Sequence, residues 1–386
     1  MAQTALDGIT VLELASYVSG PYAGMMLADL GAEVIKIESP DGGDPFRGWG
    51  AAEYSATFGS VNRNKKSVVL DLKTDAGRDA ARTLAATADV LIENYRVGTM
   101  DRLGLGYKDL AAANPRLIYC SVTAFGPTGP YAARPGYDTV GQAMGALLSV
   151  LTEMDEPRAM GISLSDHLTG MMAAYGILGA ICARERTGRG QRVETSLLSS
   201  TLAFLGENAA RYFEDGEVPD RKTRNRTAQV YAFVAGDGKP FVIHLSSPNK
   251  FWAGLCRVAG RADWIEDDRF ARAAGRRRHY DMLEAELSAI FRTKPRAHWL
   301  DALLEADVPS GPLYALDEAL ADPQVQHLGM IREIPHPKVG SVKLIGGGVT
   351  LSDTPADIRT AAPLHGEHTE EILARIGRAA KSGAAE

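Results

Sequence analysis

Apolar runs and helical patterns alternate through the first half of the chain. The short apolar runs predict strands at residues 9–14, 32–37, 67–72, 89–93 and 116–122. Helical spacing of apolar residues predicts helices between them at residues 22–30, 75–88 and 107–114. Strands that alternate with helices are typical of a parallel sheet with helices on its faces. The expected fold class is therefore α/β, with a Rossmann-like large domain.

Two helices rich in small residues are predicted next, at residues 139–150 and 166–183. Glycine and alanine at helical spacings let backbones approach closely, so we expect these helices to pack together deep in the protein. A short strand at 191–195 and one long helix at 196–213 follow.

The pattern changes after residue 213. The segment 214–226 is polar and charged, and two β runs at 229–234 and 240–245 flank a glycine-containing turn that indicates a hairpin. Helical patterns follow at 249–259, 280–291 and 295–306. The expected organisation is a large domain of residues 1–213 completed by 344–386, a linker at 214–226, a small α+β domain at 227–315 and a return linker at 316–343.

Composition narrows the class of protein. The 386 residues are 45% hydrophobic and 23% charged with a net charge of −6, and the longest basic run is Arg276-Arg277-Arg278, so nucleic-acid binding is not expected. Cys120, Cys182 and Cys256 form no CxxC pair, which favours reduced thiols. Residues 1–8 carry no signal-peptide pattern, and no apolar helix is long enough for a membrane span, so we expect a cytoplasmic protein.

Several common site motifs are missing. The turn after the first strand reads Ser16-Tyr17-Val18-Ser19-Gly20-Pro21, without the closely spaced glycines of a dinucleotide site. The sequence also has no Walker A motif, no HExxH, no GxSxG, and no metal-ligand spacing among its eight histidines. We therefore expect no metal site, and a dehydrogenase is disfavoured.

Two aspartates lie near predicted helix starts. Asp166 stands in Ser165-Asp166-His167-Leu168-Thr169-Gly170, and Asp138 follows Pro135-Gly136-Tyr137. A carboxylate in that position is often an N-cap that only stabilises the helix. The residues alone leave both the structural and the catalytic interpretation open.

A series of short motifs in order along the chain resembles the class III CoA-transferases, the family that includes formyl-CoA transferase, carnitine CoA-transferase and α-methylacyl-CoA racemase. The similarity covers nearly the whole chain. The matching segments include residues 6–13, 27–38, 62–67, 70–73, 93–98, 114–118, 166–170, 186–191, 309–312 and 366–369.

The resemblance implies a mechanism. Asp166 is the expected nucleophile, which forms a mixed anhydride with the donor acyl group and then an aspartyl-CoA thioester, and Asp138 is a second acidic residue beside it. Backbone N–H groups at the helix start are expected to stabilise oxyanions. The implied substrates are an acyl-CoA, for which succinyl-CoA is one candidate, and a small carboxylic acid, with no permanently bound cofactor.

The resemblance also implies binding residues. The expected CoA contacts are Tyr17, Val18, Ser19, Leu70, Lys73, Asn94, Tyr95 and Arg102. The expected substrate-pocket residues are Trp49, Tyr137 and Arg47. Arg47, Arg224 and Arg226 are each candidates for a second acceptor carboxylate, and each is equally a surface charge. The family fold further implies an interlocked homodimer of ring-like subunits.

Departures from the family pattern separate the alternatives. Tyr137 stands where racemases of the family have a histidine, and a phenol is a poor proton shuttle near neutral pH, which favours transfer over racemisation. The intact Asp166 motif disfavours a non-catalytic relative. Ser39 and the lack of a glycine-rich loop near 227–238 make oxalate an unexpected acceptor. No chemical role is evident for Gly366-Glu367-His368-Thr369.

Overall fold

The computed structural model describes residues 4–50, 54–246 and 249–383. It divides into two compact units, the first formed by Met1–Leu148, Ala159–Glu207 and Leu328–Glu386 and the second by Ser149–Arg158 and Asn208–His327. The domain and linker boundaries expected from the sequence stay a prediction.

The first unit is built on a six-stranded sheet in the order β3-β2-β1-β4-β5-β6, and every neighbouring pair is parallel. Its strands are β1 (Thr10–Leu14), β2 (Glu33–Glu38), β3 (Lys65–Val69), β4 (Val90–Glu93), β5 (Ile118–Thr123) and β6 (Arg192–Ser196). The predicted α/β class with a parallel sheet is confirmed.

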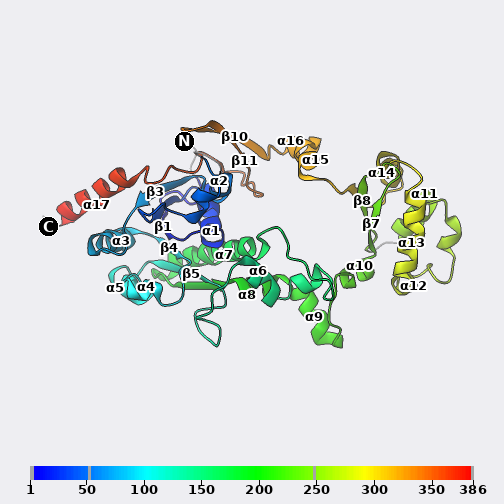
Figure 1. The fold of residues 1–386 in the computed structure, drawn as a ribbon, viewed down its shortest axis with the longest axis horizontal. Helices are drawn as coiled ribbons and strands as arrows, with labels where there is room; N and C mark the ends of the chain where they lie inside the picture. Colours follow the sequence, from blue (N-terminus) through cyan, green and yellow to red (C-terminus); the bar gives the residue numbers. More distant parts are fainter. Residues whose placement is uncertain (1–3, 51–53, 247–248, 384–386) are drawn as a thin grey trace. The chain divides into compact units, whose positions relative to one another are not determined.

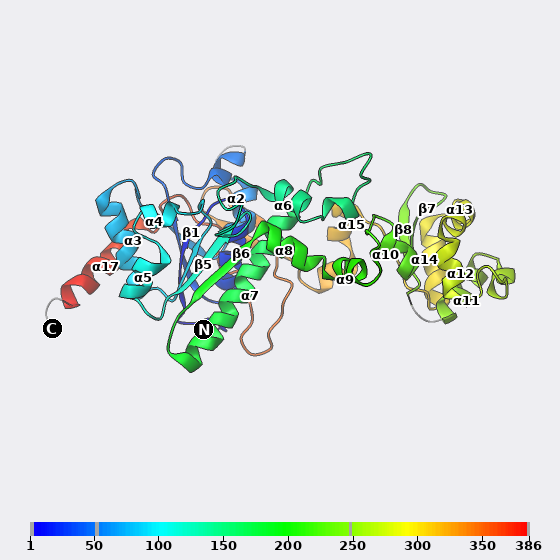
Figure 2. The same cartoon turned by 90° about the horizontal axis from the view of Figure 1, so that it is seen from below.

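Helices cover both faces of this sheet (Figure 1). On one face α1 (Ser19–Asp29) and α7 (Leu164–Thr187) bury alanine and aliphatic side chains against strand residues such as Val90 and Ile118. Figure 2 shows α7 running beside β5 and β6. On the other face α3 (Asp75–Thr87), α5 (Tyr107–Ala113) and α17 (Thr369–Gly383) pack on the opposite side chains of the same strands.

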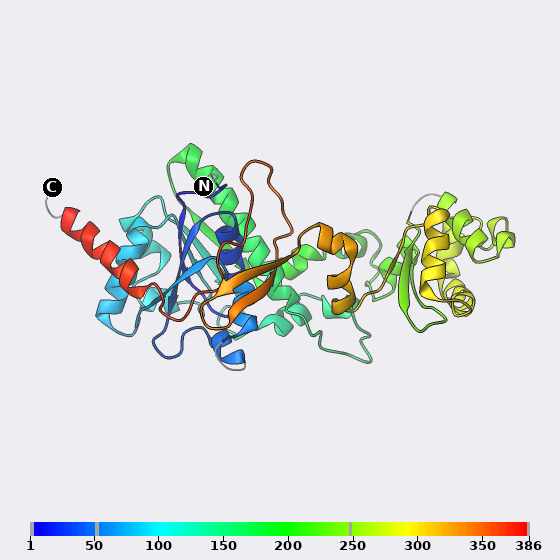
Figure 3. The same ribbon diagram turned by 90° about the horizontal axis from the view of Figure 1, so that it is seen from above.

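The remaining elements of the first unit are short helices and one hairpin. The helices are η1 (Pro45–Trp49), α2 (Ala56–Asn62), α4 (Thr99–Arg102), α6 (Asp138–Met144) and α8 (Leu197–Phe204). The strands β10 (Ile331–His336) and β11 (Gly340–Ile345) form an antiparallel hairpin, drawn in orange in Figure 3.

The second unit contains a three-stranded antiparallel sheet, β7 (Val230–Val234), β8 (Pro240–His244) and β9 (Ser310–Pro312). Its helices are α10 (Thr223–Ala228), α11 (Asn249–Val258), η3 (Ala262–Ile265), α12 (Ala273–Arg278), α13 (Tyr280–Phe291), α14 (Arg296–Glu305), α15 (Leu316–Ala321) and α16 (Pro323–His327). The short helices η2 (Leu148–Val150) and α9 (Gly206–Asp215) lie where the chain passes from one unit to the other.

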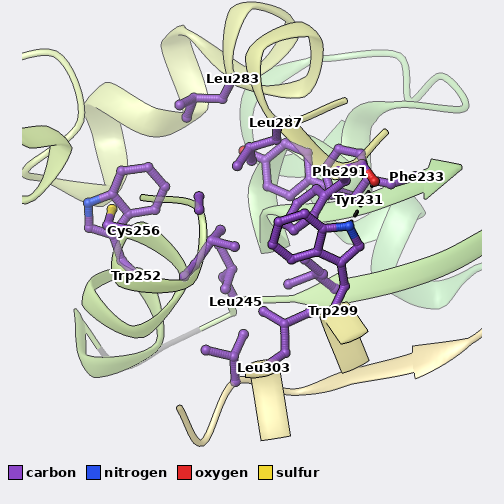
Figure 4. Packing of buried hydrophobic residues seen from close by; sticks show 14 of the residues in the cluster. Tyr231, Phe233, Leu245, Trp252, Cys256, Leu283, Leu287, Phe291, Trp299 and Leu303 are labelled. Carbon is purple, nitrogen blue, oxygen red and sulfur yellow. Dashed lines mark hydrogen bonds between the residues drawn. The ribbon is translucent and has the colours of Figure 1, made fainter. Parts of the chain in front are cut away.

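An aromatic core fills the second unit. Phe233, Phe291 and Trp299 are buried together, and the indole Nε1 of Trp299 donates to the carbonyl oxygen of Phe291 at 2.8 Å (Figure 4). Arg276, from the basic run noted in the sequence, is buried beside this core, where its guanidinium donates to Gln229 Oε1 at 2.6 Å. Because the guanidinium of Arg276 is occupied by this hydrogen bond inside the protein, the role of the residue is structural.

Several predicted elements differ in their bounds from the observed ones. The helix predicted at 196–213 is two helices, α8 and α9, because the helical conformation is interrupted at Leu205, directly before Gly206. The helix predicted at 139–150 ends at Met144, since Ala146 has a left-handed backbone with φ 62°. The strand predicted at 67–72 also differs, because β3 begins at Lys65 rather than Ser67. The helix α10 begins inside the polar segment 214–226.

The motif at residues 366–369 closes the open edge of the sheet. β3 is an edge strand, and unpaired edge groups invite pairing with other chains. Here the His368 N–H donates to the Ser67 carbonyl at 2.9 Å, and the Val69 N–H donates to Thr369 Oγ1 at 3.0 Å. The Gly366 N–H donates to Ser67 Oγ at 2.9 Å. Residues 366–369 therefore pair with polar groups of β3 that a seventh strand would otherwise bind.

Four ionisable side chains, three on β1, β2 and β3 and one in the loop after β2, are fully buried together. Lys36 Nζ lies 2.9 Å from both Glu13 Oε1 and Asp44 Oδ2, and Lys65 Nζ lies 2.8 Å from Glu13 Oε2. Burial alone would lower the pKa of Lys36, but the charges of Glu13, Asp44 and Glu38 raise it above the ordinary value. Gly24 is required here, because a Cβ atom on it would lie 2.0 Å from Glu13 Oε2.

Replacement of Lys36 tests the energetic weight of this group. Lys36→Met leaves the carboxylates of Glu13 and Asp44 buried with one cation between them, so the free energy of unfolding should fall by about 3–5 kcal/mol. Urea unfolding followed by circular dichroism measures it. Lys73→Met is the matched control, because the Lys73 side chain is 81% exposed in its pair with Asp41 and its loss should leave the unfolding curve unchanged. Equal curves for the two variants would contradict this account of the buried group.

Candidate active site

A cavity of about 480 Å³ opens at the carboxyl ends of β1, β4 and β5. In the strand order 3-2-1-4-5-6 the connections run in opposite directions from β1 and β4, and ligands of open α/β sheets bind at that point. The cavity is lined by Ser16, Tyr17, Ser19, Pro45, Asn94, Tyr95, Arg96, Val97, Arg102, Val122, Thr123, Ala124, Ala132, Ala133, Arg134, Pro135, Gly136, Tyr137, Asp166 and Leu197.

The loop after β1 is held in a fixed shape. Asn94, at the end of β4, forms two hydrogen bonds with the backbone of Ser16 in this loop. Its Oδ1 accepts from the Ser16 N–H at 3.0 Å, and its Nδ2 donates to the Ser16 carbonyl at 2.8 Å. Lys36 Nζ donates to the Ala15 carbonyl at 2.6 Å. Asp44 Oδ1 accepts from the N–H of Tyr17, whose φ is 66°. A tyrosine in this left-handed conformation needs such support, because that region is costly for residues with a Cβ atom.

Asp166 is the third residue of α7, half-buried, and reaches the cavity. The N-cap position of that helix belongs to Ser163, so the interpretation of Asp166 as an N-cap is wrong. Asp138, the first residue of α6, instead serves the neighbouring helix, where its Oδ1 accepts from the Asp166 N–H at 3.0 Å.

The electrostatic setting of Asp166 makes its charged form costly. Burial and the negative charge of Asp138 raise the pKa of Asp166 to about 7, and a hydrogen bond from the Ser19 side chain partly offsets them. A carboxylate with a raised pKa at the end of a cavity is a candidate nucleophile or general base. The expected oxyanion donors at this helix start are otherwise engaged, because the Asp166 N–H binds Asp138 and the His167 N–H binds the Ser163 carbonyl at 3.1 Å.

Close helix contacts bring these groups together. A Cβ atom on Gly170 would lie 2.7 Å from the Ser19 carbonyl oxygen, and one on Gly141 would lie 2.5 Å from Ser165 Oγ. The expectation that the small-residue helices pack closely is confirmed at these positions. Glycine is needed at both, since any side chain would push α7 away from its neighbours.

The cavity gathers most of the residues expected from the resemblance. Those that line it are Tyr17, Ser19, Asn94, Tyr95, Arg102, Tyr137 and Asp166. Tyr17 and Tyr137 form an edge-to-face ring pair with centroids 5.8 Å apart, and Tyr137 is 66% exposed.

The other expected residues lie outside the lining. Val18 and Leu70 are buried in apolar clusters, Trp49 packs on Phe46 with 66% of its surface exposed, and Lys73 pairs with Asp41. The guanidinium of Arg47 is engaged, because it binds both oxygens of Glu38 at 2.6 and 2.7 Å. Burial opposes the ionisation of Glu38, but the Arg47 hydrogen bonds and the charge of Lys36 lower its pKa to about 2.

Two cavity residues were missed by the sequence reasoning. Arg96 and Arg134 line the cavity with Arg102, and within the described residues none of the three forms an ion pair with a carboxylate. The Arg134 guanidinium lies 4.0 Å above the Tyr131 ring. Arg96 lies within the matching segment 93–98 and Arg134 directly precedes Pro135, so position in or beside these motifs is the signal that could have found them. By contrast Arg226 pairs with Asp220 and Asp281 in the second unit.

Metal and membrane features are few in the part of the chain that the structure covers. Over residues 4–50, 54–246 and 249–383 no three metal-ligating side chains gather into a site. Within the same ranges no helix is both long and apolar enough to cross a bilayer.

Comparisons with known proteins point in one direction. The sequence model of CoA-transferase family III matches residues 6–369. Succinyl-CoA:glutarate CoA-transferase of Mus musculus is 35% identical over 97% of this chain and 86% of that protein. Acetyl-CoA:oxalate CoA-transferase of Acetobacter aceti is 40% identical over 92% of each. The crystal structure of a CAIB/BAIF family protein from Brucella suis has a TM-score of 0.86 at 35% identity and covers 97% of this chain and all of that one, 100%.

The raised pKa of Asp166 predicts a pH-dependent stability difference. Between the ordinary aspartate value and about 7 the native state binds a proton that the unfolded state releases, so stability is lost as pH rises through that range. Asp166→Asn removes this loss. The variant should therefore gain roughly 2–4 kcal/mol over wild type between pH 5 and pH 8, measured by urea unfolding at both. Asp41→Asn should show no such difference, and a pH-independent gain in Asp166→Asn would refute the raised pKa.

Proposed function

The chain belongs to CoA-transferase family III and is an enzyme that transfers CoA between an acyl-CoA and a carboxylic acid, and from that premise we propose that Asp166 is its nucleophile. The observation that supports this most is the half-buried Asp166 carboxylate, which has a raised pKa and lies in the cavity at the switch point of the sheet. The donor in the proposal is succinyl-CoA or another small acyl-CoA.

The acceptor in the proposal is a small dicarboxylic acid. The names of the two relatives specify glutarate and oxalate, which each carry two carboxylates. A second carboxylate needs a cation, and Arg47 is unsuited because Glu38 occupies its guanidinium. Arg96 and Arg134 suit the role better, since they line the cavity without an acidic partner among the described residues. That oxalate itself is not the acceptor stays a prediction.

The proposed reaction proceeds in balanced acyl exchanges. The Asp166 carboxylate attacks the donor thioester carbon, the C–S bond breaks, and a mixed anhydride and CoA thiolate form. The thiolate attacks the aspartyl carbonyl and releases the donor as a free carboxylate, leaving an aspartyl-CoA thioester. The acceptor carboxylate attacks that carbonyl and expels the thiolate, which then attacks the acceptor acyl carbon. Acceptor-CoA leaves and Asp166 is regenerated, with no net proton or electron consumed.

Each residue in this proposal acts through a contact of the cavity. Ser19, whose side chain hydrogen-bonds Asp166, orients the nucleophile. Arg102 attracts the phosphates of CoA, whose negative charge it complements. The raised pKa keeps the carboxylate reactive, because a charge that is poorly stabilised in the free site gains more on forming a neutral acyl bond.

Assembly and location complete the proposal. We propose that two copies form the interlocked homodimer that the family resemblance implies, and that the enzyme acts in the cytoplasm. Size-exclusion chromatography with light scattering measures the assembly directly, and a monomer at micromolar concentration would refute it.

Trapping of the covalent intermediate tests the nucleophile. Incubation with succinyl-CoA followed by hydroxylamine should convert the Asp166 carboxyl into a hydroxamate, located by peptide mass spectrometry. Asp166→Ala should lose this label and about 10³-fold or more in kcat. Asp41→Asn, a remote exposed carboxylate, should keep both. A label at another residue, or full activity without Asp166, would sink the assignment.

Removal of single cavity cations tests the phosphate contacts. Arg102→Gln should raise the KM for succinyl-CoA about tenfold while kcat stays within threefold, since a hydrogen bond to a charged group is lost in both the bound and the transition state. Added salt should weaken wild-type binding more than that of the variant. Arg116→Gln, whose side chain is exposed and faces Glu185 at 3.9 Å, is the matched control. An unchanged KM in Arg102→Gln would remove Arg102 from the CoA site.

A further inference from the structure

Gln142 is a fully buried polar residue that no part of the proposed mechanism uses. It lies on α6, one helical turn after Asp138, so both side chains share a face of that helix. Its surroundings are α7 and α8, which pack against α6.

The amide nitrogen of Gln142 makes two hydrogen bonds. Nε2 donates to Asp138 Oδ2 at 2.5 Å and to the Ile162 carbonyl oxygen at 2.9 Å. Ile162 lies two residues before α7 begins. One amide group therefore ties Asp138 to the segment from which the nucleophile's helix starts.

Asp138 passes this constraint on to the nucleophile. Its second oxygen, Oδ1, accepts from the Asp166 N–H at 3.0 Å. The two oxygens of one carboxylate thus face Gln142 on one side and the first turn of α7 on the other. A carboxylate held at both oxygens has one orientation, so the backbone of Asp166 is fixed relative to α6.

The side-chain oxygen of Gln142 indicates that this residue does more than stabilise the fold. Gln142 Oε1 is buried, and within the described residues it has no hydrogen-bond partner. A buried acceptor without a partner destabilises the fold, whereas methionine would fill a similar volume without that cost. A residue that only filled this space would not need the amide, so the value of Gln142 lies in its two N–H bonds.

We propose that Gln142 is a positioning residue for the CoA-transfer step, which holds Asp138 and the start of α7 so that the Asp166 carboxylate faces the cavity. The inference rests on the proposed function of Asp166. Gln142 itself is not among the residues that line the cavity, so its role is positioning rather than catalytic.

The charge balance of the turn follows from the same contacts. The amide N–H of Gln142 points its positive end at the Asp138 carboxylate. The other titratable groups around this turn are the phenols of Tyr17, Tyr22 and Tyr137 and the imidazole of His167, whose Nδ1 lies 2.7 Å from the Ser163 carbonyl. On β6, Arg192 and Glu194 pair with each other at 3.0 Å.

Three variants test the proposal in succinyl-CoA-dependent transfer. Gln142→Met removes both N–H donors, and kcat should fall about tenfold with the KM for succinyl-CoA within twofold, because a misplaced nucleophile slows the step without altering the CoA contacts. Gln142→Glu puts a third carboxylate beside Asp138 and Asp166, so kcat should fall and the acidic limb of the pH–rate profile should move to higher pH.

The double variant Asp138→Asn with Gln142→Glu restores the hydrogen bond between residues 138 and 142 with reversed polarity, while the bond to the Ile162 carbonyl stays lost. The new amide can donate to the new carboxylate while its oxygen still accepts from the Asp166 N–H. Its kcat should therefore recover several-fold over Gln142→Glu alone, which two independent losses would not produce. If Gln142→Met fails to fold, the comparison of Gln142→Glu with the double variant decides.

Controls separate this inference from general destabilisation and from the proposed function. Leu84→Ala, in the core of the same unit, should lower the melting temperature and leave the pH–rate profile in place. A kcat for Gln142→Met within twofold of wild type, or additive losses in the double variant, would overturn the positioning role. Loss of transfer and of the hydroxamate label in the wild type would instead overturn the proposed function.

Discussion

The active-site loop depends on a closed set of buried charges. Glu13, Lys36, Asp44 and Lys65 lie out of reach of water, where each charge would be prohibitive alone and is tolerable only beside its partners. Burial lowers the pKa of Lys65 to about 8, because the site stabilises the charged ammonium less well than water does. The same groups also bind backbone, since Lys36 holds the Ala15 carbonyl and Asp44 holds the N–H of Tyr17. The charges of β1, β2 and β3 thus determine the shape of the cavity wall.

A second constraint sets the distance between the two acidic residues of the site. Asp138 and Asp166 belong to different helices, and their contact requires those helices to approach within the radius of a side chain. Gly141 allows this approach, because a Cβ atom on it would lie 2.5 Å from Ser165 Oγ at the start of α7. The small residues on these helices are therefore part of the chemistry: they bring the charge of Asp138 close enough to raise the pKa of Asp166.

The sequence predicts much of this structure, and its failures have physical causes. Alternating apolar runs were enough for the parallel sheet, because strands buried on both faces leave a plain signal. β3 was placed two residues late because Lys65 and Lys66 look like surface residues, and only the ion group explains a lysine inside a strand.

The same contrast holds in the site. Asp166 could be singled out because it stands in a local motif, and the resemblance supplied a role that spacing alone left open. Arg96, Arg134 and Gln142 were missed because their importance comes from contacts between segments far apart in the chain. Arg47 was expected in the substrate pocket, but its guanidinium binds Glu38 instead, because an arginine that suits a substrate carboxylate suits a protein carboxylate equally well.

Closure of the sheet edge by residues 366–369 has a consequence for how the chain is made. Ser67 and the residue that completes its pairing, His368, are separated by 301 positions. During synthesis β3 leaves the ribosome early, yet its outer hydrogen-bonding groups stay open until almost the whole chain has followed. The nascent protein therefore carries an exposed strand for most of its translation, and the lysines of β3 that disguise it in the sequence are also the kind of residue that discourages another strand from pairing there.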